Sequence, residues 1–439
     1  MGMRLACATA TIVAGIIAMM AASPALGDLL PRRGILGISA EERNGAVVAA
    51  AVLPNTPAQA AGLAPGDRIA SIDGITIRSL AQFLQTVRHP AGERVTIVVV
   101  RNGQTLSKTI ALAEYPKESD PHVTTLYDSL AIDGSLRRVL ITVPNAVAGR
   151  RPAIFFIGGI GCYSIDVADP QDSYRNLAQA LSRRGFVTMR LEKSGIGDSQ
   201  GPPCPKVDFV TESRSYSAAL SFLAADSHVD PARVYLLGHS IGTIIAPRLA
   251  QVRRPAGIVV IAAVARSWFE YELINWRRQL QLSTSPPSDY DSEMQQKEWC
   301  MHRTLIEKQS VKSVLALRPA CKDELPYPVT IEYLQQVAGL NILSPWTHLD
   351  APVLAIYGSA DFVTDHTDHQ LIVDTVNKVH PGNATLTVID DMDHYLWTEP
   401  SQQASLRNAG SGKEGRYNPK LSAAIIAWLC AREECAPPV

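Results

Sequence analysis

The sequence has no surplus of charge of either sign: 41 lysine and arginine residues face 42 aspartate and glutamate residues, for a formal net charge of -1. Nucleic-acid binding needs a basic surplus on some face, so this balance argues against a nucleic-acid partner. After residue 27 the chain also lacks an apolar run of the roughly 20 residues that a membrane-spanning helix needs. Its length, 439 residues, predicts about two or three domains.

Residues 1–27 are typical of a secretory signal peptide. Arg4 precedes the apolar run 11–22, and small residues follow, with cleavage expected after Ala25 or Gly27. The apolar run is short for a bilayer, so we expect cleavage rather than a stable membrane anchor. The alternative is an uncleaved anchor. The predicted location is periplasmic or secreted.

Cysteine is scarce. The chain has 7, of which Cys7 lies in the predicted signal peptide, so six are left in the mature protein. An even number favours disulfides in an oxidising compartment, and none of the six has the close spacing of a zinc site. The alternative is six unpaired buried thiols. The expected pairs are Cys162–Cys204, Cys300–Cys321 and Cys430–Cys435.

Residues 33–115 form a first predicted unit, in which short apolar runs alternate with turn residues. Glycine follows proline, aspartate or asparagine in the turns, where it supplies a positive φ angle. The pattern predicts a small β-rich domain with one or two helices. Strands are expected at 46–52, 68–72, 95–100 and 109–112, and a helix at 79–88.

Two motifs of this unit resemble a bacterial PDZ domain. Residues 33–38 (RGILGI) resemble the carboxylate-binding loop of that family, and residues 61–74 (AGLAPGDRIASIDG) resemble its central signature. The resemblance implies that the backbone at Leu36, Gly37 and Ile38 receives the C-terminal carboxylate of a peptide, which then extends the sheet. The alternative is a groove that is a structural relic or is blocked by the chain itself.

Residues 116–439 form a second predicted unit. After a hairpin over 122–132 and 136–143, nearly uniform apolar strands alternate with helices. Such strands are buried on both faces, so the fold class is α/β, with a doubly wound, mostly parallel sheet. The strands are expected at 153–157, 186–191, 233–237, 257–263, 353–357 and 385–389, with helices that include 172–184, 212–225 and 241–252.

The stretch from 265 to about 345 interrupts this alternation with several helical patterns. We interpret it as a helical lid insertion over the end of the sheet that carries the active site. Its aromatic side chains are candidates for lining a binding cavity or for packing between lid helices. They are Trp268, Phe269, Tyr271, Trp276, Trp299 and Tyr333.

Residues 238–242 (GHSIG) fit the pattern G-x-S-x-G, in which the serine lies on a sharp turn between a strand and a helix. The buried strand 233–237 leads in and a helix leads out. The flanking glycines keep side chains out of the bend, and the helix N-terminus favours negative charge developing near Ser240. Ser240 is therefore the candidate nucleophile; the alternative is an ordinary strand-to-helix turn.

A serine nucleophile needs a base, and the base needs an orienting acid, in the chain order Ser, Asp, His. Asp361 opens the loop after strand 353–357 and is the candidate acid, with Asp365 in reserve. His394 follows the last strand and is the candidate base.

The other nearby histidines fit structural roles. His380 precedes the last strand and would lie at the wrong edge of the sheet. His366 and His369 are expected to begin a helix rather than to bind a metal. No metal site is predicted.

An oxyanion hole needs two backbone N–H groups. Ile241 is expected to supply one, and either Gly159 or Ile160, in the glycine-rich loop after strand 153–157, the other. The loop 195–201 has the wrong glycine spacing for a dinucleotide fingerprint, so no cofactor is expected. A 162–204 disulfide would join this loop to the oxyanion loop.

The nucleophile motif and the loop 195–199 (GIGDS) resemble the α/β-hydrolase superfamily. Residues 192–195 (EKSG) and the long lid resemble its branch of serine aminopeptidases, acyl-peptidases and related esterases. The resemblance implies an α/β-hydrolase fold and hydrolysis of a small acyl ester through an acyl-enzyme. One alternative is a peptidase whose PDZ domain recruits peptide C-termini; another is a catalytically inert PDZ scaffold.

Overall fold

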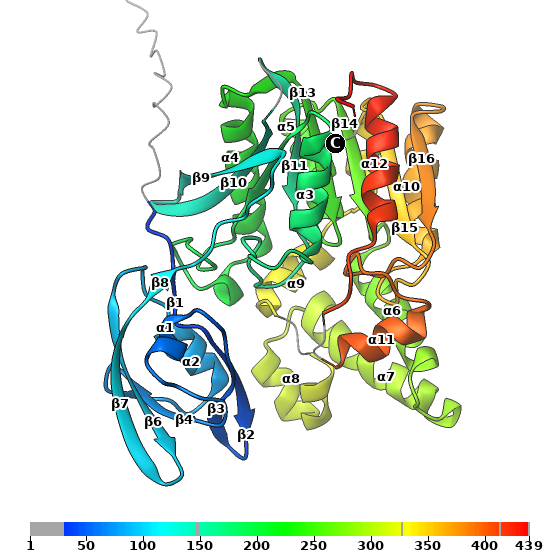
Figure 1. The fold of residues 1–439 in the computed structure, drawn as a ribbon. Helices are drawn as coiled ribbons and strands as arrows, with labels where there is room; N and C mark the ends of the chain where they lie inside the picture. The colour runs from blue at the N-terminus through cyan, green and yellow to red at the C-terminus, as the bar shows by residue number, and fades with distance from the viewer. Residues whose placement is uncertain (1–29, 146–148, 326–327, 412–413, 438–439) are drawn as a thin grey trace, which may run out of the picture.

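The computed structural model describes residues 30–145, 149–325, 328–411 and 414–437. The predicted signal peptide, residues 1–27, lies outside the described residues. Figure 1 shows two units side by side: a small β-rich PDZ unit in blue and cyan, and a larger unit built on one long sheet. The PDZ domain and the α/β-hydrolase fold expected from the sequence are confirmed.

The PDZ unit is a six-stranded antiparallel sheet in the order β2-β3-β4-β6-β7, with β5 paired to β4. Alternate residues of β6, such as Val95 and Ile97, are fully buried in its core. The elements are β2 (Ile38–Arg43), β3 (Ala46–Val52), α1 (Pro57–Ala60), β4 (Arg68–Ile72), β5 (Ile75–Thr76), α2 (Leu80–Thr86), β6 (Arg94–Arg101) and β7 (Gln104–Ala111).

The last strand of the PDZ unit begins earlier than predicted, at Gln104 instead of residue 109. Asn102 and Gly103 both have positive φ angles, 49° and 77°, and close a two-residue turn. That turn sets the register Arg101↔Gln104, and β7 pairs with β6 from this point on. The polar residues at the start of β7 hid the strand from the apolar pattern.

The hydrolase unit has an eight-stranded sheet in the order β16-β15-β14-β13-β11-β12-β10-β9. Strands β11 to β16 are parallel, whereas the hairpin β9–β10 is antiparallel. The strands are β9 (Val123–Ile132), β10 (Ser135–Pro144), β11 (Arg151–Ile157), β12 (Val187–Leu191), β13 (Val229–His239), β14 (Gly257–Ile261), β15 (Val353–Gly358) and β16 (Ala384–Ile389).

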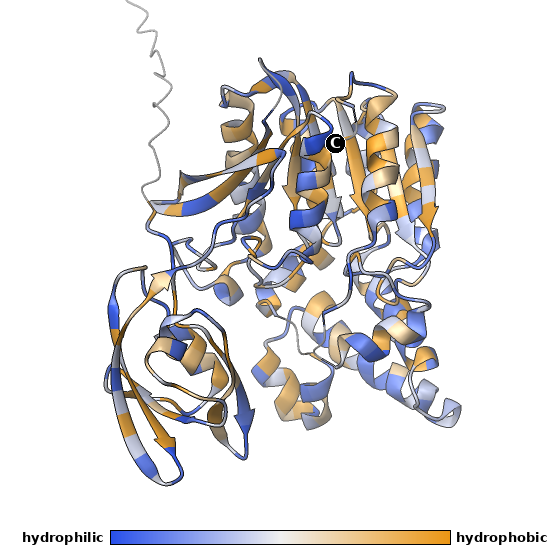
Figure 2. Ribbon diagram, viewed as in Figure 1, coloured by the Kyte–Doolittle hydropathy of each residue, from blue (hydrophilic) through white to orange (hydrophobic). Residues whose placement is uncertain are grey.

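Helices cover both faces of this sheet. Apolar side chains of α3 and α12 form one core with one face, and those of α4, α5 and α10 form a second core with the other. Figure 2 shows hydrophobic residues gathered along the central strands between these layers. The helices are α3 (Ser173–Arg183), α4 (Phe209–Ala225), α5 (Gly242–Val252), α10 (His366–Val379) and α12 (Pro419–Cys430).

The predicted lid region is helical and follows the carboxyl end of β14 (Figure 1). Its first helix, α6, contacts α11 (Gln402–Ala409) from the C-terminal part of the chain. Within the described part of the chain, no helix is both long and apolar enough to cross a membrane. The lid helices are α6 (Trp268–Leu282), α7 (Tyr290–Met301), α8 (Val311–Leu317) and α9 (Ile331–Ala338).

Three disulfides cross-link the hydrolase unit, and they are the pairs that the sequence predicts. The first joins the oxyanion loop to the loop after β12, the second lies within the lid, and the third closes a short loop after α12. They are Cys162–Cys204, Cys300–Cys321 and Cys430–Cys435.

The segment that leads into the PDZ unit is packed into the hydrolase unit. Arg32 is buried, with 6% of its surface exposed, and pairs with Asp166 and with Asp198, the latter at 2.7 Å. Buried Arg138 also binds Asp198, at 3.0 Å. The short pair β1 (Gly34–Ile35) and β8 (Ala113–Glu114) then closes the base of the PDZ unit.

A second contact between the units comes from the end of the PDZ helix α2. Arg88 donates hydrogen bonds to the carbonyls of Gly195 and Gly197, the latter at 2.7 Å. These carbonyls belong to the loop that resembles the family's G-x-G-x-S motif. The sequence pattern did not predict either contact.

Candidate active site

Ser240 lies on a tight turn between β13 and α5, with a φ angle of 55°. A left-handed conformation is strained for a residue with a side chain and is typical of functional sites. The glycines two residues before and two residues after Ser240 are needed because a side chain at either position would clash with the backbone. A Cβ atom on Gly238 would lie 2.5 Å from the carbonyl oxygen of Gly242, and one on Gly242 would lie 2.1 Å from that of Ile157.

His394 and Asp361 are in contact. Nδ1 of His394 lies 3.1 Å from Oδ2 of Asp361. The same carboxylate accepts hydrogen bonds from the backbone amides of Val363 and Thr364, at 2.7 and 2.9 Å, and from the Thr364 hydroxyl at 2.6 Å. Asp361 is therefore held in one orientation by the loop that follows β15.

The buried pair shifts both pKa values in the direction of an ion pair. Burial alone would raise the pKa of Asp361, but the charge and hydrogen bond of His394, helped by Thr364, lower it to about 2. Burial alone would lower the pKa of His394, but the charge and hydrogen bond of Asp361 and the charge of Asp393 raise it above its ordinary value.

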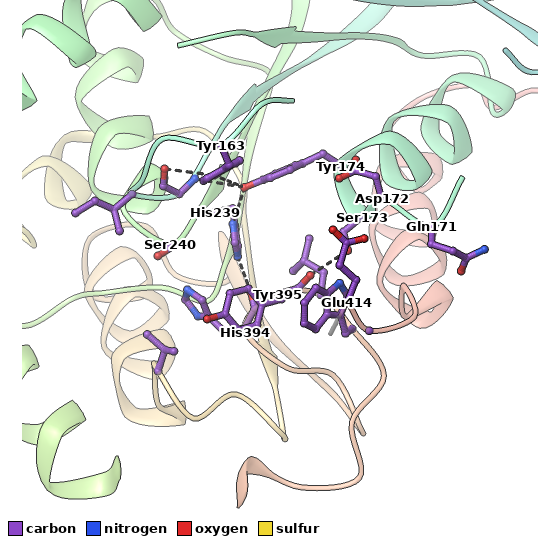
Figure 3. A pocket seen from close by; sticks show the side chains of 16 residues that line it. Tyr163, Gln171, Asp172, Ser173, Tyr174, His239, Ser240, His394, Tyr395 and Glu414 are labelled. Atoms are coloured by element: carbon purple, nitrogen blue, oxygen red, sulfur yellow. Dashed lines mark hydrogen bonds between the residues drawn. The ribbon is translucent and has the colours of Figure 1, made fainter. Parts of the chain in front are cut away.

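Ser240 and His394 line one cavity of about 450 Å³ (Figure 3). Both are largely buried, with 8% of each exposed. In the described chain no hydrogen bond joins the Ser240 hydroxyl to His394. Such bonds are often long before substrate binds, so this geometry is compatible with a serine–histidine pair.

Two backbone N–H groups beside Ser240 are free to bind an oxyanion. The amides of Ile241, just before α5, and of Ile160 donate to no acceptor among the described residues. The Gly159 amide, by contrast, donates to the Tyr174 hydroxyl at 3.3 Å. Of the two candidates that the sequence left open, Ile160 has the available N–H group.

The loop of Gly159 approaches the nucleophile closely. A Cβ atom on Gly159 would lie 3.4 Å from Cβ of Ser240 and 3.3 Å from the Tyr163 hydroxyl. The preceding amide, that of Gly158, donates to the Tyr216 hydroxyl at 3.2 Å. The backbone of this loop therefore passes in close contact with both the serine and a layer of tyrosines.

His239 connects the base to this loop, which the sequence did not predict. Its Nε2 atom lies 2.9 Å from the backbone carbonyl of His394, and its Nδ1 atom 2.7 Å from the Tyr174 hydroxyl. Burial lowers the pKa of His239 to about 3, so the ring is neutral. Because a carbonyl can only accept, Nε2 carries the proton and Nδ1 accepts from Tyr174.

The cavity is lined by loop residues, by the first residues of α3 and by the last residue of β13, but by no residue of the lid helices. Aromatic rings of Tyr163, Tyr174, Tyr395 and Trp397 form much of its wall, and the carboxyl groups of Asp172 and Glu414 lie at the end away from Ser240 (Figure 3). No sequence motif pointed to these residues.

None of the six lid aromatics lines this cavity, so of the two roles that the sequence left open, lining a binding cavity is not met at this site. Trp268, Tyr271 and Tyr333 instead pack into the main core, because α6 and α9 lie against the hydrolase body. Trp299 packs under the guanidinium group of Arg318 at 4.2 Å.

The remaining candidate residues have structural roles. Asp365 caps α10 by accepting from the Asp368 amide at 3.0 Å and pairs with Arg266. His369 lies in α10, as expected, and its Nε2 accepts from the Ala263 amide at 2.8 Å. Among the described residues, no group of three His, Cys, Asp or Glu side chains could hold a metal ion.

The residues predicted to bind a peptide terminus lie in the turn that leads into β2, an edge strand of the PDZ sheet. Gly37 has a φ angle of 89°, and a Cβ atom there would lie 2.2 Å from Cβ of Thr56. The amides of Leu36 and Gly37 donate to no acceptor within the described ranges. Further along β2, Glu42 accepts from the amide of Leu80 in α2 at 2.7 Å.

Comparison with known proteins gives relatives for each unit. Esterase EstD of Thermotoga maritima is 22% identical over 293 residues, which cover 66% of this chain and 64% of EstD. Zinc metalloprotease RasP of Shouchella clausii is 30% identical over 132 residues, or 29% of this chain and 32% of RasP. The chain thus spans less than two thirds of these curated relatives.

Among solved structures, Est1E of Butyrivibrio proteoclasticus with bound ferulic acid superposes with a TM-score of 0.46 at 13% identity, covering 69% of this chain and 98% of Est1E. A PDZ-domain family model matches residues 48–101. The family model described as serine aminopeptidase, S33, matches residues 167–401, more than half of the chain. The chain therefore belongs to the serine aminopeptidase S33 family of α/β-hydrolases and carries a PDZ domain ahead of the hydrolase unit.

Proposed function

We propose that the protein is an exported serine hydrolase that cleaves carboxylic esters with Ser240, His394 and Asp361. The observation that carries the proposal is the strained Ser240 just before the N-terminus of α5. It lines the same cavity as the imidazole of His394, which is hydrogen-bonded to the buried carboxylate of Asp361. These are the parts that acyl transfer needs: a nucleophile, a base and a group that orients the base.

In the acylation step, the Ser240 oxygen bonds to the ester carbonyl carbon, and its proton passes to Nε2 of His394. The resulting oxyanion accepts hydrogen bonds from the N–H groups of Ile241 and Ile160. The bond to the alkoxy group then breaks, and that group takes the proton from His394 and leaves as an alcohol.

Deacylation repeats the same steps with water as the nucleophile. His394 removes a proton from a water molecule, whose oxygen attacks the acyl carbon, and the proton returns to Ser240 as the carboxylic acid leaves. Asp361 keeps its charge throughout, with its pKa near 2, and stabilises the imidazolium that forms twice per cycle.

Export is part of the proposal. The three disulfides support an oxidising compartment, because cytosolic proteins rarely keep such bonds. The signal-peptide pattern of residues 1–27 supports the same location. Sequencing the N-terminus of the protein recovered from a periplasmic or culture fraction tests this part, and a chain that still begins at Met1 in the cytosol would contradict it.

The catalytic proposal is tested with Ser240→Ala. Turnover of short acyl p-nitrophenyl esters should fall on the order of 10⁴-fold or more, and a fluorophosphonate probe should no longer label the protein. Ser221→Ala, on the exposed face of α4, is the matched control and should keep both activities. A Ser240→Ala protein with undiminished turnover would refute the assignment.

A peptidase is the second candidate, favoured by the family match and by the attached PDZ domain. Both activities proceed through an acylated Ser240, so probe labelling does not separate them. Comparing kcat/KM for acyl esters with that for aminoacyl p-nitroanilides does. Faster cleavage of the anilides would replace the esterase by an aminopeptidase or acyl-peptidase. A protein that neither reacts with the probe nor turns over either substrate would leave the catalytically inert PDZ scaffold.

We also propose that the PDZ unit binds peptide C-termini at Leu36, Gly37 and Ile38. Support comes from the two unbonded amides of the turn and from the edge position of β2, which allows strand addition. Fluorescence anisotropy of a peptide library tests it. Peptides with a free carboxylate should bind, and the same sequences with a C-terminal amide should not; equal binding of both forms would contradict the carboxylate site.

A further inference from the structure

Lys193 is buried behind the oxyanion loop. It follows β12, and its Nζ atom lies 2.7 Å from the carbonyl oxygen of Gly159 and 2.9 Å from the carboxylate of Glu212. The two charged side chains are only 8% and 9% exposed. Burying an ammonium group is costly unless it is paired and hydrogen-bonded, and here the backbone of the oxyanion loop supplies one of the partners.

The bonded carbonyl belongs to the same peptide plane as the free amide of Ile160. In a trans peptide the C=O of one residue and the N–H of the next point in opposite directions. The cavity is lined by Ile160 and Ser240 but not by Lys193. A lysine that holds the carbonyl from behind the loop therefore directs the N–H group toward the nucleophile.

Other contacts of the loop are neutral. Gly158 and Gly159 donate to tyrosine hydroxyls at 3.2 and 3.3 Å, and the Tyr163 hydroxyl donates to the Gly159 carbonyl at 3.3 Å. The bond from Lys193 is shorter and charge-assisted, which makes it stronger. It also polarises the peptide, so that the N–H group on the far side becomes a better donor.

We propose that Lys193 is a positioning residue for the oxyanion hole, which fixes and polarises the peptide between Gly159 and Ile160. The inference rests on the proposed function of Ser240, because it assumes that an oxyanion forms beside that residue. Glu212 has the supporting task of compensating the charge of Lys193 in the interior.

The test is the variant Lys193→Met. We expect kcat for a short acyl ester to fall by about 10- to 100-fold, somewhat less than the loss of a whole oxyanion donor, while KM stays within about twofold. Affinity for an alkyl boronic acid, which forms a tetrahedral adduct with the serine, should fall in parallel with kcat. A purely structural role would lower the melting temperature without this parallel loss.

Three further variants keep the test interpretable. Lys193→Arg should recover most of kcat, since a guanidinium group can also donate to the carbonyl. Glu212→Gln keeps the lysine and should keep most of kcat. The double variant Lys193→Met with Glu212→Gln leaves no unpaired carboxylate, so it should fold even where the single variant does not, and it should still show the loss.

Lys297→Met is the matched control. Lys297 is likewise buried and donates to a backbone carbonyl, that of Glu324 at 2.8 Å, but in the lid. The Lys297→Met variant should leave kcat unchanged. Folded Lys193 variants that turn over like the wild type, with Ser240→Ala inactive, would overturn this inference alone; an active Ser240→Ala protein would overturn the proposed function as well.

Discussion

The imidazole of His394 and the carboxylate of Asp361 meet at 3.1 Å although 33 residues separate them in the chain. One loop follows β15 and the other follows β16, and these strands are neighbours in the sheet. Parallel strands deliver their carboxyl ends to the same edge, so two loops far apart in sequence build one site. The pair also predicts how activity depends on pH.

Wild-type kcat/KM should fall as pH decreases through the pKa of His394, because the protonated ring cannot act as a base. Asp361 raises that pKa, so the midpoint should lie above the ordinary value of 6.5. In Asp361→Asn the charge is lost and the midpoint should move to lower pH, with kcat reduced by about 10³- to 10⁴-fold. A pH–rate profile with an unmoved midpoint would rule out this coupling.

Tyr174→Phe should lower both stability and turnover. The variant removes the donor to Nδ1 of His239 and the acceptor of the Gly159 amide. Leaving buried polar groups unpaired costs about 1–3 kcal/mol, and the oxyanion loop loses one of its anchors. Thermal unfolding and kcat measured together check this. Full stability with full kcat would show that the hydroxyl contributes to neither.

Removing the Cys162–Cys204 disulfide should destabilise the protein by about 2–4 kcal/mol. Its partners are 42 residues apart, whereas those of Cys430–Cys435 are 5 apart. In the chain-entropy account, a disulfide that closes a longer loop stabilises the folded protein more, because it removes more conformational entropy from the unfolded chain. The two double-serine variants should therefore differ in denaturant midpoint, and the first should also lower kcat because it frees the oxyanion loop. Equal midpoints would contradict the loop-length argument.

Arg32→Ala should destabilise the whole chain by about 3 kcal/mol, because it leaves buried carboxylates of Asp166 and Asp198 short of a partner. Arg43→Ala is the control. Its ion pair with Glu41 is solvent-exposed, and such pairs contribute little. Calorimetry would decide the matter, and similar melting temperatures for the two variants would argue against a buried cluster that joins the units.

Much of the architecture could be predicted because local signals were strong. The apolar runs of the parallel strands, the turn glycines of the PDZ unit and the G-x-S-x-G elbow all depend on residues close together in sequence. The placement of Asp361 and His394 after their strands follows from the chain order Ser, Asp, His and from the shared edge at which parallel strands end. These features need no knowledge of distant contacts.

What could not be predicted depends on contacts between distant residues. Ile160 rather than Gly159 has the free oxyanion-hole amide because the Gly159 amide is bonded to the hydroxyl of Tyr174 in α3. The same hydroxyl contacts His239, which is 65 residues away in the chain. The lid aromatics have the helical spacing of either a core or a cavity wall, and only the packing of α6 against the body decides between them. The Arg32 cluster likewise joins segments that carry no shared motif.

The ion pairs of buried Arg32 and the hydrogen bonds of Arg88 to the loop after β12 hold the PDZ unit in one position against the hydrolase unit. A loosely tethered recruitment domain would let its guest sample many positions. For the peptide binding proposed above, a fixed PDZ unit has a further consequence. A peptide held by its C-terminal residue would present the nucleophile with a bond at one set distance from that end, and the products would be uniform in length.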